Sequence, residues 1–157
     1  MKIKKILLGT SVVLATGMAL YHACVIKKAR DFEAGFDKSP GSMDETVLYG
    51  GKMKDYRDQT MRNTKIGAFF GGMQLDFSDV VTEQDDYRMD ISIINGGLNI
   101  IVPDNFKLKI VDTCKFGGIA DHTVCIDPDN SVALAVYADV TCGGLNFENA
   151  PESNPHQ

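Results

Sequence analysis

A pair of adjacent glycines recurs five times in this chain of 157 residues. The pairs are Gly50-Gly51, Gly71-Gly72, Gly96-Gly97, Gly117-Gly118 and Gly143-Gly144. Their first members are separated by 21, 25, 21 and 26 residues, so every second pair recurs after 46 or 47 residues. Self-similarity at a fixed period is typical of folds that stack one small structural unit. The pairs therefore predict a repeat fold, and the alternating steps indicate a two-sided coil.

The sequence that follows each pair supports β structure. In three copies an apolar residue opens an alternating stretch, as in Met73-Gln74-Leu75-Asp76-Phe77, Leu98-Asn99-Ile100 and Leu145-Asn146-Phe147. Such alternation indicates a strand with one buried face and one exposed face. The first copy carries Lys52 and Lys54 instead and is degenerate, as terminal repeats often are.

The glycines themselves indicate a requirement of the backbone, because glycine weakens the interior of a strand. Either the chain bends there with positive φ, or a neighbouring coil approaches too closely for a Cβ atom. Stacked coils would need both. We therefore predict an all-β domain built as a repeat β-solenoid, or single-stranded β-helix, after one N-terminal transmembrane helix. An antiparallel β-sandwich with turn glycines is the alternative. Residues 55–64 are polar and are expected to form a short helix or a loop.

The N-terminal segment predicts a membrane anchor. Residues Ile6 to Ile26 carry no formal charge, and a helix of 21 residues spans roughly 30 Å, the thickness of a bilayer's hydrocarbon core. Lysines precede this run, and Lys27, Lys28 and Arg30 follow it. A cleaved signal peptide is the competing interpretation, but its apolar core is shorter and ends in a small-x-small exit. Equal numbers of basic residues on the two flanks leave the side of the domain open.

These features divide the chain into four parts. Residues 1–28 form the predicted anchor, and 29–46 a flexible tether, since they mix charge with Ser39-Pro40-Gly41-Ser42. Residues 47–148 form the β domain, and 149–157 a disordered tail.

Composition argues against several functions. The net charge of −5 does not favour binding to a nucleic-acid backbone. Of the four cysteines, Cys24 lies in the apolar run, which leaves an odd number in the domain. Buried free thiols are expected there, with one bridge between Cys114 and Cys125 as the alternative.

No group of residues predicts catalysis, a cofactor or a metal. A Cys125–His122 pair would supply a nucleophile and a base, but a surface histidine in a polar turn is the ordinary interpretation. An acidic stretch lacks the ligand spacing and turn glycine of an EF-hand. It comprises Asp76, Asp79, Glu83, Asp85, Asp86 and Asp90. We expect that the protein is not an enzyme.

The order of the motifs resembles the C-terminal domain of LiaF-like proteins, the cell-wall-active antibiotic response family, also called the toast-rack domain. The resemblance covers about residues 47 to 148. It rests on Leu75-Asp76-Phe77-Ser78, on Gly96-Gly97-Leu98-Asn99-Ile100-Ile101-Val102-Pro103 with Phe106 after it, and on the closing Cys142-Gly143-Gly144-Leu145-Asn146-Phe147. The chain differs from the best-known arrangement in having one membrane helix rather than several.

The resemblance implies a bacterial signalling accessory protein of the cytoplasmic membrane. Such a protein modulates a sensor kinase that answers envelope stress, through protein contact and without catalytic residues. Two alternatives stay open: a structural, self-assembling envelope-associated solenoid, and a ligand-binding envelope protein. The surface that a partner would contact is not identified by the sequence.

Overall fold

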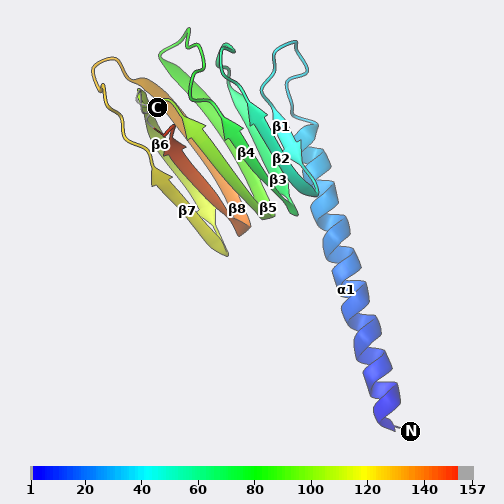
Figure 1. Cartoon of the computed structure of the whole chain (residues 1–157). Coiled ribbons are helices and arrows are strands. Elements are labelled where there is room, and N and C mark those ends of the chain that lie inside the picture. Colours follow the sequence, from blue (N-terminus) through cyan, green and yellow to red (C-terminus); the bar gives the residue numbers. More distant parts are fainter. Residues whose placement is uncertain (1, 152–157) are drawn as a thin grey trace, which may run out of the picture.

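The computed structural model describes residues 2–151, and the side chains of residues 14–151. Figure 1 shows a long helix, α1 (Lys2–Glu33), that projects from a domain made of strands. The strands are β1 (Glu45–Val47), β2 (Gly50–Asp55), β3 (Thr64–Phe69), β4 (Gly71–Asp76), β5 (Asp86–Val102), β6 (Phe106–Cys114), β7 (Gly117–His122) and β8 (Val132–Asn149). The prediction of a β-rich domain is confirmed.

Each copy of the glycine motif marks a corner between two strand arms. We number the copies as repeats 1 to 5, which comprise residues 45–55, 64–76, 86–102, 106–122 and 132–149. In repeats 3 and 5 a single bent strand, β5 or β8, forms both arms. In the other repeats two strands share this role, as β3 and β4 do in repeat 2.

Neighbouring repeats pair in parallel along both arms. This arrangement does not fit the alternative of an antiparallel sandwich. The glycine pairs all occupy equivalent corners, so the alternating steps of the sequence do not mark two kinds of corner. They reflect unequal loops between repeats, from three residues at 103–105 to nine residues at 77–85 and 123–131, together with first arms of unequal length.

The repeats do not stack in the order of the sequence. Repeat 5 lies between repeats 3 and 4, because β8 pairs with β5 on one side and with β6 and β7 on the other. The spatial order is therefore 1, 2, 3, 5, 4. The inward side chains explain this order. Those of repeat 5, such as Ala138 and Phe147, are apolar and buried, whereas repeat 4 has exposed Asp112 and Asp121 at the paired positions.

Two columns of inward side chains are apolar in the three middle repeats and charged at both ends. One column on the second arms consists, in spatial order, of Lys54, Leu75, Ile100, Phe147 and Asp121. A column on the first arms consists of Glu45, Ile66, Ile91, Ala138 and Asp112. Inward charges on terminal strands oppose further edge-to-edge pairing. The core is therefore centred on repeats 2, 3 and 5, and Val47 of repeat 1 and Phe106 of repeat 4 extend it toward the two ends.

The end of α1 packs against the outside of the domain, next to β3. Val25 and Ala29 are buried there with Phe69 and Ile94. The region predicted as a flexible tether, residues 29–46, thus differs from the prediction. Its first residues belong to α1. Met43 is buried, and its carbonyl oxygen accepts hydrogen bonds from the hydroxyl groups of Tyr56 and Thr64.

The predicted anchor, residues 1–28, begins outside the residues whose side chains are described. Where side chains are described, no helix is both long enough and apolar enough to cross a membrane. Most of the predicted tail, residues 152–157, also lies outside the described part, and Asn149 is the last residue of β8.

Candidate functional site

The ten glycines of the motif, which sequence alone placed in five separate copies, come together at one corner of the domain. The first glycines align, since Gly71 pairs with Gly50, and Gly143 pairs with both Gly96 and Gly117. The second glycines align beside them, from Gly51 at one end to Gly118 at the other. The structure thus makes one continuous feature of residues that lie up to 94 positions apart.

In four of the five pairs the first glycine is required by close approach of the backbone, whereas a Cβ atom on Gly50 would meet no atom within 4 Å. A Cβ atom on Gly96 would lie 2.5 Å from the carbonyl oxygen of Gly71. A Cβ atom on Gly143 would lie 2.3 Å from the carbonyl oxygen of Gly96. No side chain fits at such distances, so these positions admit only glycine.

Positive φ, the other predicted requirement, falls mainly on the residue before the pair. Phe70, Asn95 and Cys142 have φ values of 54°, 52° and 55°. This left-handed conformation costs on the order of 1–2 kcal/mol for a residue other than glycine. At these three corners a left-handed residue is followed by one without a side chain, whereas Gly50 and Gly117 themselves have positive φ. The sequence pattern did not reveal this division of roles.

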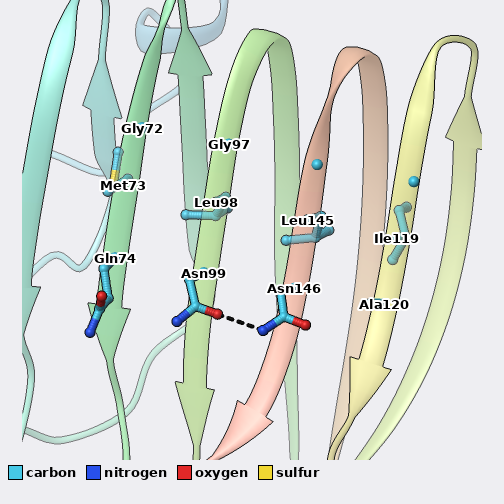
Figure 2. Close-up of a pocket in the computed structure, with 12 residues that line it drawn as sticks. Gly72, Met73, Gln74, Gly97, Leu98, Asn99, Ile119, Ala120, Leu145 and Asn146 are labelled. Carbon is cyan, nitrogen blue, oxygen red and sulfur yellow. Dashed lines mark hydrogen bonds between the residues drawn. The ribbon is translucent and has the colours of Figure 1, made fainter.

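The second glycine of each pair serves no packing requirement. A Cβ atom on Gly97, Gly118 or Gly144 would meet no atom within 4 Å. These glycines instead form the floor of a shallow groove that crosses β4, β5, β8 and β7 on the outer face of the domain (Figure 2). Outward side chains of the same strands line it further along: Gln74, Asn99, Asn146 and Ala120. We refer to the groove and these side chains as the amide face.

Hydrogen bonds order the centre of the amide face. The amide nitrogen of Asn146 donates to the side-chain oxygen of Asn99 at 2.8 Å, as Figure 2 shows. The amide nitrogen of Asn99 in turn donates to a carboxylate oxygen of Glu148 at 2.8 Å. Stacked asparagines of this kind reinforce neighbouring parallel strands. The result is a flat, rigid surface that offers amide groups and bare backbone to a partner.

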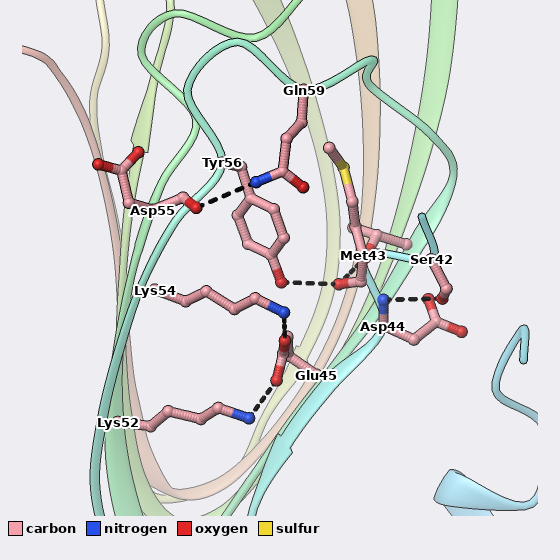
Figure 3. A network of polar contacts seen from close by, with 10 residues as sticks. Ser42, Met43, Asp44, Glu45, Lys52, Lys54, Asp55, Tyr56 and Gln59 are labelled. Atoms are coloured by element: carbon pink, nitrogen blue, oxygen red, sulfur yellow. Dashed lines mark hydrogen bonds and ion pairs between the residues drawn. The ribbon is translucent and has the colours of Figure 1, made fainter. Parts of the chain in front are cut away.

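A polar network closes the opposite end of the stack, in repeat 1 (Figure 3). The buried carboxylate of Glu45 on β1 accepts hydrogen bonds from the amines of both Lys52 and Lys54 on β2. Beside them the buried hydroxyl of Tyr56 donates to the carbonyl oxygen of Met43 at 3.2 Å. Burial, with a further contribution from Glu45, raises the pKa of Tyr56. The network joins the two arms of the terminal repeat by charge, where the inner repeats use apolar contacts.

This network predicts an acid-dependent contribution to stability. Burial raises the pKa of Glu45, but the hydrogen bonds from Lys52 and Lys54 outweigh it and hold the net pKa below the ordinary value of 4.5. A carboxyl of lowered pKa stabilises the fold above its unfolded pKa and loses that contribution as the pH falls through its folded pKa. We expect Glu45→Gln to lower the free energy of unfolding by about 1–2 kcal/mol at pH 7.

The pH dependence of urea unfolding checks this prediction. The difference between the original protein and Glu45→Gln should shrink as the pH falls from about 5 to 3. Asp55→Asn is the matched control, because Asp55 pairs with Arg57 on the exposed surface, where ion pairs contribute little. A difference that stays constant with pH would contradict the assignment.

The other candidate residues do not form a site among the described residues. His122 is exposed at the end of β7, Cys125 is half-buried in the next loop, and the two share no hydrogen bond. No cluster of three or more His, Cys, Asp or Glu residues in the described part of the chain is arranged to hold a metal ion. All four cysteines lie in that part and are free thiols, and Cys114 and Cys142 are exposed rather than buried as expected.

Comparison with known proteins adds no identification. No protein-family model, no curated protein and no solved structure matches the chain. The assignment of a function therefore rests on the residues and on their arrangement.

Proposed function

We propose that this protein is a β-solenoid module, held at a membrane by α1, that regulates another membrane protein through contact and not through catalysis. The observation that carries the proposal is the exposed apolar part of α1. Leu14, Met18 and Leu20 are 67–68% exposed and belong to neither hydrophobic cluster of the domain. They continue the uncharged run that begins at Ile6. The apolar part of a helix that does not pack on its own domain needs an apolar environment that a membrane or another protein supplies.

The β-solenoid part of the proposal rests on the corners and the columns. Equivalent residues stack in register through neighbouring repeats, and the loops between repeats carry the chain from one level of the stack to another. Terminal repeats with polar or charged inward residues are a general feature of stacked repeat folds.

The amide face is the surface that we propose for the partner. It is open, flat and fixed by the hydrogen bonds between Asn99, Asn146 and Glu148. The side chain of the neighbouring Gln74 makes no hydrogen bond to another described residue, so its amide group is available to a partner. The resemblance to LiaF-like proteins favours a sensor kinase of an envelope-stress system as the partner.

Site-specific crosslinking tests this proposal. A photo-crosslinking amino acid at Gln74, on the amide face, should capture a membrane protein in bacterial membranes. The same amino acid at Ala133, which is exposed on the first arm of repeat 5, is the matched control and should capture much less. Equal capture from the two positions, or none from Gln74, would contradict a role for the amide face.

Self-assembly through the free edges is a second candidate. It is favoured by Lys54 and Asp121, which have opposite charges at the two ends of one inward column. It is opposed by Glu45 and Asp112, which have like charges at the ends of another. A photo-crosslinker at Ala120, on the edge strand β7, would join two copies of the chain if self-assembly is correct, and would not if the edges are blocked.

A further inference from the structure

The direction of α1 relative to the corners suggests how the domain is placed at a bilayer. The residue before each glycine pair forms one edge of the domain, which we name the corner edge. In spatial order it consists of Tyr49, Phe70, Asn95, Cys142 and Phe116. The helix crosses this edge at Tyr21 and His22, and its N-terminal part continues beyond the domain on the same side (Figure 1).

The contacts at the crossing are well defined. The amide nitrogen of Asn95 donates to the hydroxyl of Tyr21 at 2.8 Å. The ring of His22 stacks on Phe70 at a centroid distance of 4.4 Å and faces Tyr49 at 6.1 Å. Val25 and Ala29 are then buried against the sheet. The helix is therefore fixed to the domain from Tyr21 onward, and only the part before Tyr21 is free to enter a membrane.

The length of this free part leaves no space between the domain and the bilayer. The uncharged residues 6–20 rise roughly 22 Å, less than the hydrocarbon thickness of about 30 Å, so residues 2–5, which include Lys2, Lys4 and Lys5, have to reach the far headgroup region. If residues 2–20 span the bilayer in this way, then Tyr21 and the corner edge lie at its surface. Lys27 and Lys28, exposed on the helix roughly 9–10 Å further along, are then at the depth of the lipid headgroups.

Charge along the strands is distributed as such a placement requires. The corner segments 47–51, 69–72, 94–97, 114–118 and 141–144 contain no acidic residue and one basic residue, Lys115. The opposite ends of the repeats, residues 55–63, 77–86, 103–105, 121–131 and 148–151, contain eleven acidic residues and two basic ones. An anionic membrane surface repels the acidic end and tolerates the corner edge.

Exposed aromatic rings complete the corner edge. Phe116 is 71% exposed, and Tyr49, whose ring also stacks on Phe70, is 52% exposed. Tyr21 is 45% exposed next to them. Aromatic rings are enriched at the level of the headgroups, where one part of the ring is in an apolar environment.

We propose that the corner edge contacts the bilayer directly, with Phe116 inserted among the lipid headgroups and the acidic loops directed away from the membrane. This inference rests on the proposed anchoring by α1. It gives the domain one fixed orientation, in which the amide face stands upright on the membrane and meets partners that lie beside it in the bilayer.

Tryptophan fluorescence in vesicles tests the contact, because the chain contains no tryptophan of its own. The full chain carrying Phe116→Trp is reconstituted in phosphatidylcholine–phosphatidylglycerol vesicles, with and without phosphatidylcholine brominated near the headgroup end of its acyl chains. We expect the brominated lipid to quench most of the tryptophan emission. In vesicles without brominated lipid, the emission maximum should lie at a shorter wavelength than that of the same variant unfolded in urea. Val124→Trp, at an exposed position of the opposite end, should show neither effect.

Flotation of the same vesicles separates the two ways in which the experiment can fail. If the protein floats with the vesicles but Phe116→Trp is not quenched, the anchor holds and the contact of the corner edge is overturned. If the protein does not float, the anchoring itself is wrong and the contact is overturned with it. Equal quenching of Phe116→Trp and Val124→Trp would contradict a fixed orientation. Both positions are exposed, so circular dichroism should show an unchanged fold for each variant.

Discussion

Gly143→Ala is expected to destabilise the β domain by about 3 kcal/mol, whereas Gly144→Ala, one residue further on, is expected to change its stability by no more than about 0.5 kcal/mol. The Cβ atom of the first variant would lie 2.3 Å from the carbonyl oxygen of Gly96 and 2.8 Å from Cγ2 of Ile93. To relieve this steric overlap, two stacked repeats would have to separate at the centre of the core. The Cβ atom of the second variant would meet no atom within 4 Å.

The two variants form a matched pair, since each adds one methyl group to the same motif in the same strand. Alanine reduces the conformational entropy of the unfolded chain equally in both, so this effect cancels in the comparison. The midpoint and slope of urea unfolding, followed by circular dichroism, measure the difference. Equal stability of the two variants would show that the repeats do not approach one another through the first glycine of each pair.

Much of the corner follows from the sequence, because its cause is local and repeated. The alternation after Gly71-Gly72, Gly96-Gly97 and Gly143-Gly144 predicts strands with one buried face, and the structure buries Leu75, Ile100 and Phe147 on it. The close approach of backbones was one of two explanations offered for the glycines. Which glycine it concerns became clear only from the distances between neighbouring repeats.

The order of the repeats could not be read from the motif. Every copy presents the same glycines, so each is able to pair in register with any other. The signal that distinguishes them is the charge of the inward residues. Lys54 at one end of the stack and Asp121 at the other are the only charged members of a column that is otherwise apolar. Polar inward positions thus identify terminal repeats, and repeat 4 is terminal although it is not last in the chain.

The packing of residues 29–46 could not be predicted from the sequence either. Their composition is that of a linker, and the segment between α1 and β1 is short of apolar residues. Its order depends on a few contacts with distant parts of the chain. Phe32 packs near Phe69, and Lys65 donates from its backbone nitrogen to Asp44 at 2.7 Å. Tertiary contacts of this kind leave no periodic trace in a sequence.

The position of repeat 5 has a consequence for disulfide formation. Asn99 of repeat 3 is paired with Asn146 of repeat 5, so their Cα atoms are about one strand spacing, 4.8 Å, apart. Ala120 of repeat 4 is paired with Asn146 on the far side. It therefore lies about two spacings, 9.6 Å, from Asn99. Disulfides require Cα atoms within about 7 Å.

The most direct test of the stack is therefore a pair of double-cysteine variants in a chain whose four natural cysteines are replaced by serine. Asn99→Cys/Asn146→Cys should oxidise almost completely and should stabilise the domain by up to about 4 kcal/mol, since it closes a loop of some 47 residues. Asn99→Cys/Ala120→Cys should stay reduced under the same conditions. Non-reducing electrophoresis with peptide mass spectrometry measures both. A bridge between positions 99 and 120 in place of the one between 99 and 146 would contradict the order 1, 2, 3, 5, 4, and the amide face built on that order.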